Sequence, residues 1–158
     1  MATVNAIPKG YTTVTPSLIF RDAAKAIDFY KRAFGAQERM QSKGPDGKIM
    51  HAEIQIGSSI LMIMDEVMGM RSAEAIGASP VSFYLYFEDA DAAHKKAVAA
   101  GAKEMMPVTD MFWGDRMGHI TDPFGYGWNV AAHVKDVTPE EMKKGQEEFM
   151  KQMAGAPR

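Results

Sequence analysis

Residues 22–36, DAAKAIDFYKRAFGA, decide the fold. Apolar residues recur there at i, i+4, i+7 and i+11, the spacing of one helix face: Ala23, Ile27, Tyr30 and Phe34. Asp22 is a typical N-cap residue and Gly35 a typical C-terminal stop. We therefore expect a helix between Asp22 and Gly35. A strand over 11–20 should precede it, in which Pro16 indicates an edge position or a bulge.

The same order of elements occurs twice along the chain. After the first helix we expect three strands, at 36–43, 48–56 and 59–64. A strand, a helix and three strands then recur, at 82–87, 89–100, 103–109, 115–121 and 127–134. The two halves also have identical residues at an offset near 67 positions, for example Asp22-Ala23 with Asp89-Ala90 and Gly47-x-x-Met50 with Gly114-x-x-Met117.

This repeat predicts an α+β fold built from two βαβββ modules. Each module has roughly 50 residues, too few to bury an adequate core alone. We therefore expect the modules to pair into one curved mixed sheet, with the helices covering its outer side. The chain divides into an N-terminal segment, a first module, a linker, a second module and a C-terminal helix with its tail: 1–10, 11–65, 66–81, 82–136 and 137–158.

The C-terminal helix has its own start signal. Thr138, Pro139 and Glu141 stand at the N-cap, N1 and N3 positions of a capping box. An apolar stripe follows, at Met142, Phe149 and Met153. We expect this stripe to dock on the domain or on a partner chain.

Composition excludes several classes of function. The 158 residues carry 18 Lys and Arg against 20 Asp and Glu, and this balance argues against a nucleic-acid partner or an anionic membrane. Without cysteine the chain has no disulfide, no Cys-based metal site and no Cys nucleophile. No apolar run approaches the roughly 20 residues that span a bilayer, so we expect a cytoplasmic protein with no membrane partner.

Several short motifs together resemble one known superfamily. They are 22–31 (DAAKAIDFYK), 51–54 (HAEI), 112–116 (FWGDR), 122–128 (DPFGYGW) and 137–142 (VTPEEM). Their order and spacing are similar to the vicinal-oxygen-chelate superfamily, the glyoxalase, bleomycin-resistance and extradiol-dioxygenase group, and more narrowly to its PhnB-like branch. The resemblance implies paired βαβββ modules around a U-shaped cavity, and often a homodimer. It does not fix a reaction, because this scaffold hosts lyases, isomerases, dioxygenases and binding proteins.

The metal-ligand positions that the resemblance implies are filled by unsuitable residues. Metal-dependent members place a His or Gln in the first strand, a carboxylate in the fourth, a His in the fifth and a Glu in the eighth. The matching positions here are Thr15, Leu61 or Met62, Ser82 and Asn129. None is a good ligand for a divalent transition metal. We therefore predict no metal cofactor, with a divalent metal at a nonstandard site as the alternative.

His51 and Glu53 are the candidate catalytic pair. They stand at i and i+2 of a predicted strand, so both side chains point the same way. A carboxylate beside an imidazole fixes its tautomer and raises its basicity, which suits a general base or two ligands of a nonstandard metal site. The alternative is a polar sheet face in solvent or at a dimer contact. His94, among lysines on the second helix, is expected to be solvated.

The candidate ligand-binding residues lie mainly in the second half. Phe112, Trp113, Asp115 and Arg116 could stack a planar ligand and clamp an anionic group, or the aromatics could fold onto the core beside a local Asp115–Arg116 ion pair.

Alternation along the strands sets further candidates on shared faces: Tyr84 and Tyr86 with Ser82, and His133 with Asn129. The chain also holds 14 methionines, several near the predicted cavity, and soft thioethers favour an aromatic or apolar ligand. The sequence thus predicts a protein that binds a small, aromatic or apolar organic molecule without the usual metal. A glyoxalase-like or dioxygenase-like enzyme is the alternative.

Overall fold

Both predicted βαβββ modules are present, which confirms the fold class. The structure is a computed structural model that describes residues 5–155, so parts of the expected terminal segments (1–4 and 156–158) lie outside the described residues. The first module consists of β1 (Ser17–Phe20), α1 (Ala23–Phe34), β2 (Gln37–Lys43), β3 (Ile49–Ile56) and β4 (Ser59–Asp65). The second consists of β5 (Ser82–Tyr86), α3 (Ala90–Ala100), β6 (Lys103–Asp110), β7 (Asp115–Thr121) and β8 (Gly127–His133).

Two further helices complete the chain. The linker carries a single turn of helix, α2 (Ala73–Ile76), which the sequence pattern did not predict and which Ser72 caps. The C-terminal helix is α4 (Pro139–Gly155). Within the described residues, no helix is long and apolar enough to cross a membrane.

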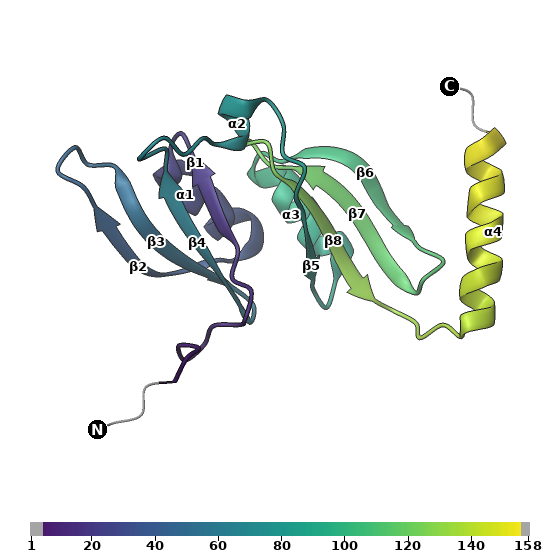
Figure 1. Cartoon of the computed structure of the whole chain (residues 1–158). Helices are drawn as coiled ribbons and strands as arrows, with labels where there is room; N and C mark the ends of the chain where they lie inside the picture. Colours follow the sequence, from purple (N-terminus) through teal and green to yellow (C-terminus); the bar gives the residue numbers. More distant parts are fainter. Residues whose placement is uncertain (1–4, 156–158) are drawn as a thin grey trace.

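The eight strands form two four-stranded sheets rather than one continuous sheet (Figure 1). Sheet 1 has the order β1-β4-β3-β2 and sheet 2 the order β5-β8-β7-β6. In each sheet the first strand pairs in parallel with the last strand of its module, and the other pairs are antiparallel. β1 is an edge strand, as Pro16 indicates, and it begins only after that residue.

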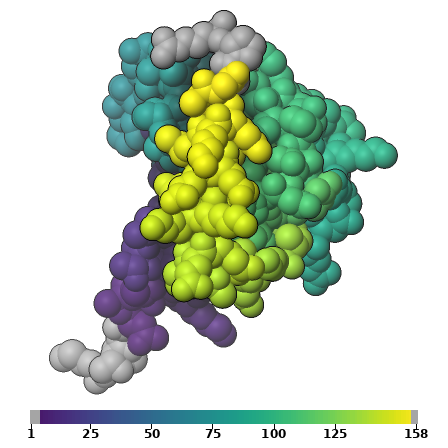
Figure 2. Space-filling view, turned by 90° about the vertical axis from the view of Figure 1, so that its right-hand side faces the viewer, coloured from purple at the N-terminus to yellow at the C-terminus, as the bar shows by residue number. Residues whose placement is uncertain are grey.

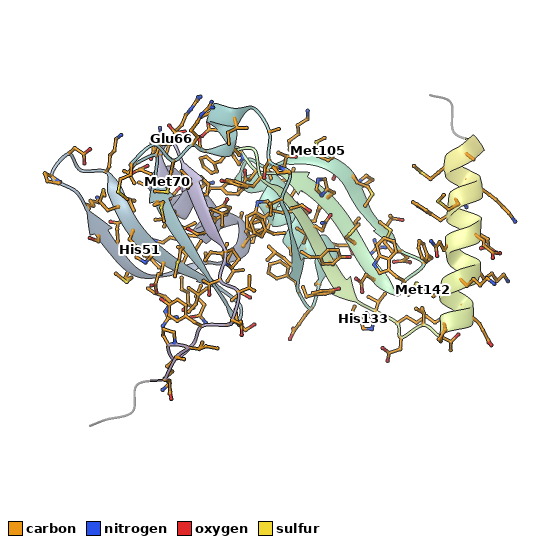
Figure 3. The ribbon with its side chains drawn as sticks, viewed as in Figure 1. His51, Glu66, Met70, Met105, His133 and Met142 are labelled. Atoms are coloured by element: carbon orange, nitrogen blue, oxygen red, sulfur yellow. The ribbon has the colours of Figure 1, made fainter. Side chains whose placement is uncertain are left out.

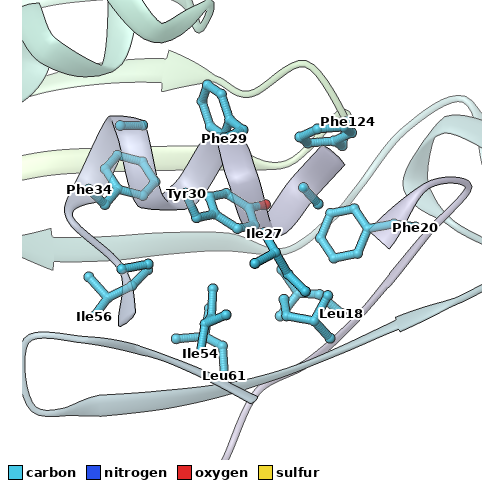
Figure 4. Close-up of a cluster of buried hydrophobic side chains, with 14 of the residues drawn as sticks. Leu18, Phe20, Ile27, Phe29, Tyr30, Phe34, Ile54, Ile56, Leu61 and Phe124 are labelled. Atoms are coloured by element: carbon cyan, nitrogen blue, oxygen red, sulfur yellow. The ribbon is translucent and has the colours of Figure 1, made fainter. Parts of the chain in front are cut away.

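One hydrophobic core joins the modules. We call the helix-bearing side of each sheet its inner face and the opposite side its outer face. In the view of Figure 1, α1 and α3 lie side by side in the middle of the molecule, with sheet 1 on one side and sheet 2 on the other. Tyr30 on α1 belongs to the same core cluster as Leu18 and Ile54 of sheet 1 (Figure 4). Its ring also packs against Trp128 of sheet 2, with ring centroids 5.3 Å apart.

The turn between β7 and β8 contributes a hydrogen-bonded carboxylate to this core. Asp122 is buried, and its carboxylate accepts hydrogen bonds from the Tyr30 hydroxyl at 2.6 Å and the Trp128 indole at 2.8 Å. The backbone N–H groups of Phe124 and Tyr126 also donate to it, each at 2.9 Å. Burial raises the pKa of Asp122, although the four donors act in the opposite direction. The carboxylate therefore ties α1 of the first module to the second module.

The predicted cap residues are confirmed in both modules. The side chains of Asp22 and Asp89 accept from the backbone N–H three residues on, at the starts of α1 and α3. Gly35 and Gly101 end the same helices with positive φ angles, which is why glycine is needed there. The internal repeat is thus a structural one.

His94 is buried, so the expectation of a solvated side chain is wrong. Ala90, His94 and Ala97 follow one another at i, i+4 and i+7, and this spacing places all three on the inner side of α3. The ring packs against Gly118 of β7, where an added Cβ would lie 2.7 Å from His94 Cδ2. Its Nε2 has no hydrogen-bond partner in the structure.

α4 stands at the margin of the fold (Figures 1 and 2). Its capping box is formed: Thr138 Oγ1 accepts from the Glu141 N–H at 3.2 Å, and Glu141 Oε2 accepts from the Thr138 N–H at 2.8 Å. None of its described residues is buried. Its stripe touches the body through Phe149, whose ring lies 5.7 Å from that of Phe112, so most of the stripe remains exposed.

Candidate functional site

The outer face of sheet 2 gathers most of the predicted ligand-binding residues. Ser82 and Tyr84 reach it from β5, Asp115 from β7, and Asn129 and His133 from β8. Alternation explains this, because Phe83, Trp128 and Val130, which stand between them, enter the core. His133 lies at the end of this sheet, whereas His51 lies on the other sheet (Figure 3).

Asp115 is the centre of the site, with 4% of the residue exposed. Its Oδ2 accepts from the hydroxyls of Tyr84 and Tyr86, each at 3.0 Å, and from the Trp113 indole at 3.2 Å. Its Oδ1 lies 2.9 Å from His133 Nδ1. One buried carboxylate thus holds three aromatic side chains and an imidazole.

Electrostatics keep this carboxylate ionised. Burial raises the pKa of Asp115, but hydrogen bonds from His133, Tyr86 and Tyr84 outweigh it, and the net pKa is lowered. The pKa of His133 is raised, first by Asp136, whose Oδ1 lies 3.0 Å from His133 Nε2, and then by Asp115. Burial and the neighbouring carboxylate raise the pKa of Tyr84 to about 12. The arrangement is thus an ionised Asp115 in contact with two tyrosine hydroxyls and with His133, whose pKa the two carboxylates raise.

The other end of this face is a smaller polar group. His119 Nδ1 lies 2.9 Å from Asn129 Oδ1. A Cβ added to Gly127 would lie 3.1 Å from the His119 ring and 3.4 Å from Ser82 Cβ, which places these side chains around the glycine. The outer face of sheet 2 therefore runs from aromatic rings at one end to hydrogen-bonding groups at the other.

Two predicted residues lie away from this group. Arg116 points to the opposite side of β7 from Asp115, because successive strand residues alternate, and it pairs with Asp91 at 2.5 Å and Asp110 at 2.9 Å. The expected Asp115–Arg116 ion pair is therefore wrong, and so is a clamp that uses both. Phe112 packs edge-on against Trp113, with centroids 4.9 Å apart, and faces α4.

The outer face of sheet 1 carries a second polar cluster. Glu53 is 7% exposed and accepts from the Tyr11 hydroxyl. His51 Nε2 lies 3.3 Å from Glu53 Oε1, so the predicted pair is in contact. The hydrogen bond from Tyr11 is the main cause of the lowered pKa of Glu53, with His51 adding to it against the effect of burial. The carboxylate is thus held ionised, which suits orienting His51 better than accepting a proton itself.

The positions that hold the metal in related proteins do not fit one here. Met62 of β4, not the buried Leu61, shares the outer face with Glu53, its partner in the β3–β4 register. Thr15 lies near Met62 on sheet 1, whereas Ser82 and Asn129 lie on sheet 2. The donors are two hydroxyls, a thioether and an amide, a weak set for a divalent transition metal. Among residues 5–155, no group of three or more His, Asp or Glu side chains is arranged to hold one.

Each outer face adjoins a small hollow. Tyr84 and Tyr86, with the β3–β4 turn (56–59), line a cavity of about 250 Å³. Tyr11, Thr15 and Met62, with the segment before β1, line another of about 380 Å³. Small-molecule pockets are typically about 300–1,000 Å³, so the hollow beside Tyr84 and Tyr86 is smaller than a complete site and the one beside Tyr11 is near the lower end of the range.

Sequence reasoning missed two contributors to these clusters, Tyr11 and Asp136, and it left Tyr86 and His119 out of the final set of site residues. Alternation of β5 signals Tyr86, which follows Tyr84 on the same face. His119 is likewise on the outer face of β7 with Asp115. Tyr11 and Asp136 lie outside the strands, and only the tertiary structure brings them to Glu53 and His133.

Known proteins share this fold. The family model for the glyoxalase/bleomycin resistance protein/dioxygenase superfamily matches residues 12–130. An uncharacterized protein of Mycobacterium tuberculosis is 38% identical over 135 residues, covering 82% of this chain and 79% of that protein. The crystal structure of an Arabidopsis thaliana gene product is 33% identical, with a TM-score of 0.62 over 75% of this chain and 97% of that chain.

A PhnB protein from Bacillus cereus has the same fold, with 18% identity and a TM-score of 0.61 over 77% of this chain and 99% of that chain. The likeness at this level of identity concerns the fold. The family model and the repeat of βαβββ modules confirm the resemblance to the superfamily read from the sequence motifs. The chain belongs to the glyoxalase/bleomycin resistance protein/dioxygenase superfamily.

Proposed function

We propose that this protein binds a small planar aromatic or apolar organic molecule against the outer face of sheet 2, without the metal that many relatives use. The observation that carries the proposal is the grouping of Tyr84, Tyr86 and Trp113, whose polar atoms all turn to Asp115. We call these three residues the aromatic surface. Their ring faces, not their polar tips, are left for a ligand, and ring faces stack well on planar molecules.

The surroundings of the aromatic surface favour the same ligand class. Met117 lies on the outer face of β7, next to Ala131 of β8, and is only 7% exposed, so it forms a soft, polarizable layer within this face rather than a free surface. Asn129 and His119 supply hydrogen-bonding groups farther along the same face. A mostly apolar surface with a few directed polar groups is typical of small-molecule sites.

We further propose that the protein is a cytoplasmic homodimer. A single chain offers only a small hollow beside Tyr84 and Tyr86, and the helices α1 and α3 pack on the inner faces of the sheets. A second copy that set its sheet 1 against sheet 2 would enclose the ligand and bring Tyr11 and Glu53 opposite the aromatic surface. Sedimentation equilibrium should find a dimer. A monomer with full ligand affinity would remove this part of the proposal.

Thermal-shift and fluorescence titrations with a broad panel of planar aromatic compounds test the binding function. We expect at least one compound to raise the midpoint temperature of thermal unfolding of the wild-type protein. Trp113→Ala should weaken the binding of that compound at least tenfold. Phe149→Ala is the matched control, because Phe149 is an exposed aromatic residue on α4 whose ring contacts Phe112 and is not part of the aromatic surface. No shift across the panel, or equal losses in both variants, would overturn the proposal.

A second candidate function is a glyoxalase-like or dioxygenase-like enzyme that uses His51 and Glu53 as an acid–base pair or at a nonstandard metal site. The 3.3 Å contact between the two side chains, supported by Tyr11, favours it. Elemental analysis of protein purified without chelator separates the two functions. Stoichiometric metal that is lost on His51→Ala would support the enzyme and count against metal-free binding. Metal-free protein would count against the nonstandard metal site and leave only the acid–base pair as the enzymatic alternative.

A further inference from the structure

Asp115 connects side chains from three separate parts of the second module. Tyr84 and Tyr86 come from β5, Trp113 from the loop before β7, and His133 from the end of β8. An ionised carboxylate has only acceptor sites, and three of these donors share Oδ2 while His133 contacts Oδ1. Each aromatic ring is thereby fixed at its polar end.

The rings remain accessible although their polar atoms are bound. Tyr84 and Tyr86 are 40% and 62% exposed, and their centroids lie 5.1 Å apart with a 38° angle between the planes. Binding that immobilises an exposed side chain is opposed by the rotamer freedom that the side chain loses. The hydrogen bonds to Asp115 have already restricted these side chains, so they lose less conformational entropy when a ligand stacks on them.

The charge of Asp115 depends on His133. A buried carboxylate is costly unless a counter-charge and hydrogen bonds compensate it. His133 lies between two carboxylates, with Nδ1 at 2.9 Å from Asp115 and Nε2 at 3.0 Å from Asp136. Both ring nitrogens can donate only in the protonated imidazole. The adjacent Lys135 pairs with Glu141, which leaves the two Asp groups and the two tyrosine hydroxyls as the titratable groups around this centre.

We propose that Asp115 is a positioning residue that holds the aromatic surface rigid for the ligand, with protonated His133 as the counter-charge that keeps Asp115 in place. The inference rests on the proposed function, because it assigns the preparation of the binding face to one carboxylate. It also makes binding depend on pH. His133 has a raised pKa, so its contribution is complete below the ordinary His value of about 6.5 and is lost as the pH rises through the raised value.

The ligand arm of the test uses phenazine, a planar aromatic that stays neutral between about pH 5 and 9, the range over which histidine titrates. The affinity of the wild-type protein for phenazine should fall roughly tenfold as the pH rises through the pKa of His133. A tenfold change is what results when ligand binding moves the pKa of one group by about one unit. His133→Gln should abolish this step, and Asp115→Asn should weaken binding at every pH. His119→Gln removes the other imidazole of the same face and should keep the step, whatever it does to affinity.

A second arm needs no ligand. The emission of Trp113, obtained as the difference between the wild-type protein and Trp113→Phe, should change with pH at the His133 transition and be constant in His133→Gln. Because His133 is largely exposed at the end of β8, His133→Gln tests the idea even where Asp115→Asn fails to fold. A Trp113 transition that persists unchanged in folded His133→Gln would overturn the inference. If the Trp113 transition is present but phenazine and the wider panel do not bind, the positioning stands and the proposed function fails.

Discussion

Replacing Asp122 with alanine should destabilise the whole protein rather than one module. The carboxylate is 4% exposed and accepts from Tyr30 of the first module and from Trp128, Phe124 and Tyr126 of the second. Asp122→Ala leaves the fully buried Tyr30 hydroxyl and Trp128 indole without their acceptor. Each buried donor left unsatisfied costs about 1–3 kcal/mol.

The expected loss can be bounded from this geometry. Water can reach the backbone N–H groups of Phe124 and Tyr126 more easily, because Pro123 and Gly125 beside them are exposed. The two side-chain donors therefore dominate, and relief of the desolvated carboxylate offsets part of their cost. We expect a loss of about 3–4 kcal/mol in the free energy of unfolding. For a chain of this size that corresponds to a fall in Tm of roughly 6–16 °C.

Urea unfolding followed by circular dichroism and by tryptophan fluorescence measures this loss. Asp89→Ala is the matched control: it removes an exposed aspartate that accepts from one backbone N–H, of Ala92 at 2.9 Å, and should cost only about 1 kcal/mol. Tyr30→Phe isolates the bond between the modules. The reasoning is refuted if Asp122→Ala costs no more than Asp89→Ala, or if the wild-type modules unfold in two separate transitions.

Three further predictions concern other parts of the chain. Gly114→Ala should lower the free energy of unfolding in urea by more than about 3 kcal/mol, because φ is +95° and the new Cβ would lie 1.9 Å from the Lys135 carbonyl oxygen. Gly57→Ala is the control: its φ is also positive but the space around it is open, so it should lower the free energy of unfolding by only about 1–2 kcal/mol. Thr138→Ala should speed amide exchange in α4 without shifting the unfolding midpoint of the core, since no described residue of that helix is buried. Glu53→Gln should lower stability at neutral pH. That deficit should shrink as the pH falls below about 4.3, because the folded-state pKa of Glu53 is lowered and its contribution disappears in acid; a deficit independent of pH would contradict the role of the carboxylate.

Local patterns predicted most of the elements and several of the site residues. The helix spacing and caps around Tyr30 predicted α1, and alternation along β5 and β8 predicted that Ser82 and Tyr84, like Asn129 and His133, share faces. The predictions for Arg116 and His94 were wrong although the same local rules apply to them. The same alternation sets Arg116 opposite Asp115, and the same helical spacing sets His94 inward, so both corrections follow from rules that the sequence already contained.

The sequence by itself determined the repeated βαβββ order, because caps, turns and hydrophobic periods act over a few residues. It also indicated, through the family resemblance, that the usual metal-ligand positions hold Thr15, Leu61 or Met62, Ser82 and Asn129. The structure then placed Met62, and not Leu61, on the outer face. Only the tertiary structure decided that the strands form two sheets and that Asp115 gathers Tyr84, Tyr86, Trp113 and His133. Those contacts join segments up to 31 residues apart. They depend on how the strands lie beside one another, which no local pattern of residues specifies.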